Sequence, residues 1–136
     1  IEECSVGGLN LLDVLSGYER VVLLDGIHTR GGRVGFWYHF TADRLRPTAH
    51  LSNVHDANLA TALALGRALG IPLPDDEQIH VLAVEIEDDE TFGTELSPAL
   101  ARAYPDCRAS VLAELRRILS VTSRSGPDPR DPPAPP

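Results

Sequence analysis

Two residues combine types and positions that could support hydrolytic or metal chemistry. Asp25 follows an apolar run at 21–24, and His55 falls in the first turn of a helix expected between 52 and 70. In open α/β sheets the working groups gather at the carboxyl ends of the strands, so we expect both side chains in one crevice. A carboxylate oxygen and an imidazole nitrogen together suit a divalent metal of intermediate softness, such as zinc or nickel.

Both residues also have simple structural explanations. Asp25 and Gly26 form a good turn after a strand, and an imidazole in a first helical turn can hydrogen-bond locally. Four other histidines compete for a metal role. His28 is the only other one near the expected crevice; His80 alternates into a buried strand, and His39 and His50 look like surface positions.

Two further features need interpretation. The acidic run Glu85, Glu87, Asp88, Asp89 and Glu90 is best explained as a solvated strand end and loop. The pair Gly7 and Gly8 either turns the backbone between a strand and a helix, or leaves amide groups open for an extended peptide to pair with.

Composition excludes several classes of function. The chain has 12 basic and 20 acidic residues, a net charge of -8, which argues against a nucleic-acid-binding protein. All the basic residues are arginines, so a phosphate-loop lysine and Schiff-base chemistry, including that of pyridoxal enzymes, are excluded. Cys4 and Cys107 form no Cys-x-x-Cys pair and read as buried, reduced thiols.

The order of elements predicts an α/β fold. Apolar runs at 20–24 and 79–86 are typical of strands buried on both faces, and alternation at 34–40 predicts a strand near a sheet edge. Helical spacing of apolar residues predicts helices at 9–15 and 52–70. Ser97 and Pro98 predict the start of a last helical region. Pro105 should split this region, and the final helix after it should cover the sheet.

We therefore expect one domain over 1–121 and a disordered Pro-rich tail over 122–136. No stretch reaches the roughly 18 apolar residues of a membrane helix, and no secretory leader is visible, so we expect a cytoplasmic protein with no membrane partner.

Four segments, in this order and spacing, resemble the nickel-iron hydrogenase maturation endopeptidase family. They are 3–12 (ECSVGGLNLL), 21–27 (VVLLDGI), 51–56 (LSNVHD) and 95–98 (ELSP), and the resemblance extends over about 3–119. It implies a three-layer α/β/α, Rossmann-like domain with a mostly parallel sheet. It also implies a metal-dependent endopeptidase that removes the C-terminal extension of the hydrogenase large-subunit precursor after nickel insertion.

The family's metal ligands are a Glu, an Asp and a His, and the last two correspond to Asp25 and His55, which would be catalytic as well as metal-binding. The family's substrate-recognition segment corresponds to Gly7 and Gly8. Nickel would arrive with the substrate, and zinc or cadmium could take its place in a crystal. Either a metal-polarised water or a water activated by Asp25 would attack the peptide bond; Cys4 as nucleophile is the weaker alternative, because no histidine can be placed beside it.

The family's opening strand, its Gly-x-Gly-Asn turn and the helix that carries the acidic first ligand have no counterpart here. The chain has no Met and opens with Ile1, so we expect these parts upstream. Because two side chains rarely make a competent metal site, a non-catalytic Rossmann-like binding module, or an inactive fragment of such a peptidase, is the alternative.

Overall fold

The structure of the chain is a computed structural model that describes residues 1–3, 8–45, 54–88 and 94–120. For 54–58 it describes the backbone alone. Several residues of the sequence interpretation lie outside the described residues, namely Cys4, Gly7, His50, Asp89, Glu90 and the whole of the predicted tail.

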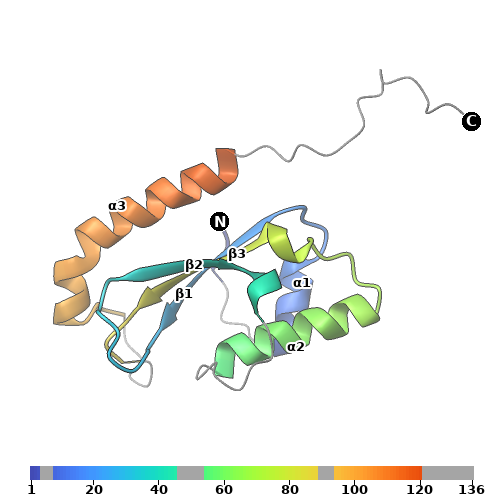
Figure 1. Cartoon of the computed structure of the whole chain (residues 1–136), viewed down its shortest axis with the longest axis horizontal. Helices are drawn as coiled ribbons and strands as arrows, with labels where there is room; N and C mark the ends of the chain where they lie inside the picture. Colours follow the sequence, from blue (N-terminus) through green and yellow to red (C-terminus); the bar gives the residue numbers. More distant parts are fainter. Residues whose placement is uncertain (4–7, 46–53, 89–93, 121–136) are drawn as a thin grey trace, which may run out of the picture.

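Within the described residues the fold is a three-stranded mixed sheet with helices on both faces (Figure 1). The strands are β1 (Val21–Ile27), β2 (Trp37–Thr41) and β3 (Ile79–Glu85), in the order β1-β3-β2. The helices are α1 (Leu11–Leu15), α2 (Val54–Ala68) and α3 (Pro98–Ser120), with short 3-10 turns η1 (Gly8–Asn10), η2 (Ala42–Arg44) and η3 (Asp76–Gln78).

The prediction of an α/β fold is confirmed, but that of a mostly parallel sheet is wrong for the described strands. β3 is parallel to β1 and antiparallel to β2. The reason is the loop 28–36, which joins β1 to β2. A parallel connection needs about a dozen residues or more, usually with a helix, so this short loop returns the chain in the opposite direction.

The central strand β3 divides the core between its two faces. Ile79, Val81 and Ala83 pack with α1, α2 and η2, whereas Leu82 packs with α3. Figure 1 shows α3 on one side of the sheet and α1 and α2 on the other. Successive side chains of a strand point to opposite faces, so this one buried strand supplies both halves of the core.

Strand β1 lies at the edge of the sheet formed by the described strands, and the expectation that it is buried on both faces is wrong there. It pairs with β3 alone among the described strands, and Leu24 is 66% exposed. The prediction of a strand near the sheet edge is confirmed for β2. An apolar run alone does not distinguish a central strand from an edge strand, because it does not count the neighbours of the strand.

The long helix α3 begins where its sequence predicts. The Ser97 hydroxyl accepts a hydrogen bond from the Leu100 amide at 3.3 Å, and Pro98 occupies the first helical position. The predicted split at Pro105 is wrong, since α3 continues through it. Pro105 has no N–H to donate to the Ala101 carbonyl oxygen, and both residues are exposed, so water can satisfy that oxygen.

Candidate active site

Asp25 lies inside β1 and not at its end, because the strand continues to Ile27. Its neighbours at alternate positions, Leu23 and Ile27, pack on the α2 side of the sheet, so alternation places the Asp25 side chain on that side as well. The residue is exposed, and its Oδ1 atom accepts a hydrogen bond from the Gly26 amide at 2.8 Å. A solvent-accessible carboxyl group therefore lies near the carboxyl end of β1.

His55 is the second residue of α2, as the helix prediction required. Figure 1 shows that α2 begins at the end of the sheet toward which the arrows of β1 and β3 point. The backbone of His55 therefore lies at the same end of the sheet as Asp25, on the side to which the Asp25 side chain points by alternation. The side chain of His55 is outside the described residues, so the bridging of the two side chains by one metal stays a prediction.

Of the two predicted substrate-binding glycines, only Gly8 is described. It opens η1 with φ of +59°, and a side chain there would meet no atom within 4 Å. This left-handed backbone conformation explains glycine at the position, because other residues rarely adopt it. Substrate binding by Gly7 and Gly8 stays a prediction.

Glu85, at the end of β3, is the functional candidate that the sequence interpretation missed. It was expected in a solvated acidic run, but its exposure is 0%. Its carboxyl oxygens accept hydrogen bonds from the amide and the hydroxyl of Thr29, at 2.5 and 2.9 Å. Thr29 lies two residues after the end of β1. The feature of the sequence that could have indicated this contact is therefore a side chain able to donate a hydrogen bond, in the loop that follows β1. Charge patterning alone could not show that this loop covers the carboxyl group.

Two of the other histidines form a pair on the α3 side of the sheet. The Nε2 atom of His39 lies 3.1 Å from Nδ1 of His80, and Nδ1 of His39 lies 2.8 Å from a carboxylate oxygen of Glu114 on α3. Because the carboxylate only accepts, Nδ1 of His39 carries a proton, and the donor of the hydrogen bond between His39 and His80 depends on the tautomers of the two rings. The expectation that His39 is a surface residue is wrong, since its side chain is 22% exposed. His80, which was expected in a buried strand, lies in β3 and is hydrogen-bonded to His39.

Burial lowers the pKa of His80 below 6.5, and the nearby His39, Arg20 and Arg117 lower it further, against the opposing effect of Glu114. The pKa of His80 is thus lower in the folded chain than in the unfolded chain, where it is about 6.5. Between these two values the unfolded chain binds more protons, so the free energy of unfolding falls as the pH drops below 6.5. We expect the His80→Asn variant to lose less free energy of unfolding than the parent between pH 7.5 and 5.5. The difference is at most about 1.4 kcal/mol per pH unit, and smaller for a half-buried group.

Urea unfolding at the two pH values measures this difference, with exposed His28→Asn as the control. Hydrogen bonding to Arg117 lowers the pKa of Glu114 below 4.5, so the loss of its contribution begins at lower pH and does not enter this range. Equal pH slopes for the parent and the His80→Asn variant would show that His80 is not responsible.

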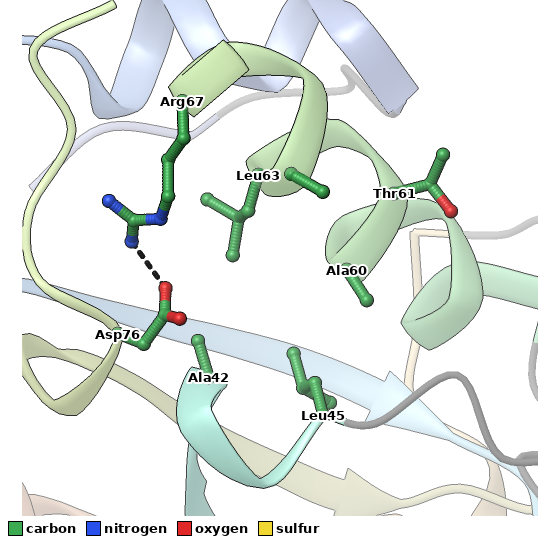
Figure 2. Close-up of a pocket in the computed structure, with 8 residues that line it drawn as sticks. Ala42, Leu45, Ala60, Thr61, Leu63, Arg67 and Asp76 are labelled. Carbon is green, nitrogen blue, oxygen red and sulfur yellow. Dashed lines mark hydrogen bonds and ion pairs between the residues drawn. The ribbon is translucent and has the colours of Figure 1, made fainter.

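A hollow of about 440 Å³ lies between η2, α2 and η3 (Figure 2). Its walls are mostly apolar, and Arg67 and Asp76 at its rim are joined by an ion pair. Because η2 follows β2 and η3 precedes β3, this hollow is at the opposite end of the sheet from Asp25. It is therefore separate from the candidate active site.

Among the described residues, no group of three or more His, Cys, Asp or Glu side chains is placed to hold a metal ion. The candidate active site thus consists of an accessible carboxyl group near the carboxyl end of a parallel strand pair, facing the side where α2 begins, with His55 as its second residue. A carboxylate and an imidazole are suitable donors for nickel or zinc. No helix in the described part of the chain is long and apolar enough to cross a membrane.

These features define the class as an α/β domain whose polar candidate groups lie at the carboxyl end of its parallel strands. The sequence profile of the hydrogenase maturation protease family matches residues 5–114, and the chain belongs to this family. It is therefore a protease, a maturation endopeptidase.

The structure is similar to that of the hydrogenase maturating endopeptidase HybD from E. coli. The TM-score is 0.58 at 20% sequence identity, and the match covers 82% of this chain and 67% of HybD. At this identity the likeness supports the fold. No curated protein sequence gave a significant match.

Proposed function

We propose that this protein is a metal-dependent endopeptidase that removes the C-terminal extension of a nickel-iron hydrogenase large-subunit precursor. Membership of the hydrogenase maturation protease family supports this substrate class. The observation that carries the proposal is the placement of Asp25, whose accessible carboxyl group lies on the side of the sheet where the helix of His55 begins. In this proposal the complete domain is a three-layer α/β/α, Rossmann-like fold.

Asp25 and His55 act as protein ligands to nickel that the precursor already carries. The nickel would then lie between the substrate's own ligands and these two side chains, which brings the scissile peptide bond to the crevice. Holding the scissile peptide bond at the catalytic groups in this way makes the reaction effectively intramolecular. The attacking group is a water molecule, polarised by the metal or deprotonated by Asp25.

Gly7 and Gly8 complete the proposed site by pairing with the extended C-terminal segment of the precursor. Backbone amides that no side chain covers can bind an extended peptide through main-chain hydrogen bonds. The positive φ of Gly8 and the open space beside it are consistent with a close approach of substrate backbone.

A processing assay tests the proposal. The chain, together with any natural N-terminal extension of it, is incubated with nickel-loaded and with nickel-free precursor, and the products are analysed by intact mass spectrometry. We expect a single C-terminal cut in the nickel-loaded precursor alone. Equal cutting of both forms would contradict the role of nickel, and binding without any cutting would favour a non-catalytic binding module.

A further inference from the structure

The loop 28–36 is attached to the end of β3 at several points. The Gly35 amide donates to the Glu85 carbonyl oxygen at 2.9 Å, and the Glu85 amide donates to the Phe36 carbonyl oxygen at 2.8 Å. The side chain of Glu85 adds the two hydrogen bonds from Thr29, near the start of the loop. A single residue of β3 therefore binds both ends of this loop.

The carboxyl group of Glu85 is enclosed by the loop. A Cβ atom at Gly32 would lie 2.1 Å from its carboxyl carbon, which is less than any real contact, so glycine at 32 leaves room for the carboxyl group. Burial of a carboxyl group is costly unless its oxygens are hydrogen-bonded, and here both accept from Thr29. The arrangement is thus specific, since an apolar side chain would leave the Thr29 amide without this acceptor.

This attachment lies beside Asp25. Glu85 is opposite Ile27 in the parallel register, and Asp25 is opposite Ala83, two residues earlier on each strand. By alternation Asp25 and Glu85 point to the same side of the sheet. The loop begins directly after β1 and covers the carboxyl end of β3, so it forms a wall next to the carboxyl group of Asp25.

We propose that Glu85 is a positioning residue, whose buried carboxyl group holds the loop 28–36 in place as one wall of the site at Asp25. Without this attachment the loop opens, and an extended substrate loses a fixed surface at the carboxyl end of the sheet. The effect on substrate rests on the proposed function, whereas the attachment of the loop does not.

Limited trypsin digestion tests the attachment directly. Arg30 and Arg33 are exposed in the loop, and the chain has no lysine, so cuts after these two residues report on loop opening. In Glu85→Met, which removes both acceptors at similar volume, we expect these cuts to be about tenfold faster relative to cuts after Arg67. Thr29→Val removes the hydroxyl hydrogen bond alone, so we expect the same cuts to be about threefold faster relative to cuts after Arg67.

Two controls separate this effect from a general loss of stability. Glu85→Gln keeps an oxygen that accepts from the Thr29 amide and adds an NH2 group that can donate to the Thr29 hydroxyl oxygen. The rate of cutting after Arg30 and Arg33 in this variant should therefore stay within about twofold of the parent rate. Glu77→Met changes an exposed glutamate at the other end of the sheet and should also be neutral. A parallel rise of all cuts in Glu85→Met, or no rise in either Glu85→Met or Thr29→Val, would overturn the proposal.

The processing assay tests the effect on substrate. Glu85→Met should raise KM for the nickel-loaded precursor about fivefold while kcat stays within about twofold, and Glu85→Gln should restore the parent KM. Selective loop cutting with an unchanged KM would show that the loop does not position substrate. A parent protein without processing activity would refute the proposed function, and the trypsin result would still decide whether Glu85 holds the loop.

Discussion

Replacement of His55 by Ala or of Asp25 by Asn should reduce cleavage of a nickel-loaded precursor by at least about 100-fold. Each substitution removes one of the two proposed protein ligands, so the metal of the substrate is no longer held at the crevice. The measurement is the initial rate of appearance of the processed precursor. Exposed Asp13→Asn is the matched control for Asp25→Asn and should keep the parent rate.

The same variants can be examined without substrate, by titration calorimetry with nickel or zinc. We expect weak binding, because water must fill the remaining coordination positions. It should disappear in His55→Ala and weaken in Asp25→Asn, with proton release below about pH 6.5 as the imidazole gives up its proton. If His55→Ala binds metal as well as the parent, the assignment of this residue as a ligand is wrong.

The largest effect on stability is expected for Leu82→Ala. Leu82 is 1% exposed and packs with Cys107, Val111 and Ile118 of α3. Truncation of a buried leucine costs about 2–5 kcal/mol, through lost apolar contacts and the cavity that remains. This is a large fraction of the roughly 5–15 kcal/mol that stabilises an ordinary domain.

Urea unfolding, followed by circular dichroism, measures the change in the free energy of unfolding. Leu119→Ala is the control, since Leu119 is on the same helix but is 61% exposed, and it should change stability by less than about 0.5 kcal/mol. An equal effect of the two substitutions would show that α3 does not pack on Leu82.

The attachment of α3 to the sheet also includes polar groups at four-residue spacing. The Trp37 indole donates to the Ser110 hydroxyl at 2.8 Å, His39 pairs with Glu114, and Arg20 donates to the Ile118 carbonyl oxygen at 2.9 Å. Residues four apart lie on one face of a helix, so these contacts align with the apolar stripe. This explains why Glu114, a charged residue, occupies the sheet-facing side of α3.

Local chemistry of the sequence by itself determined where most elements lie. Ser97 and Pro98 mark the start of α3 because a capping hydroxyl and a proline suit the first helical positions. Gly70, with φ of +73°, follows the end of α2 because other residues rarely adopt that conformation. The short-range patterns also identified Asp25 and His55 as candidates at one end of an α/β sheet.

Only the tertiary structure decided the neighbours of each strand and the surroundings of each charge. Within the described residues, strand order makes β1 an edge strand, which its apolar run does not reveal. Exposure of the Pro105 turn permits a proline inside α3, and the loop 28–36 turns Glu85 from an expected solvated residue into a buried one. The physical reason is that burial and pairing depend on residues distant in the chain, such as Thr29 and Glu85, whose meeting no local pattern specifies.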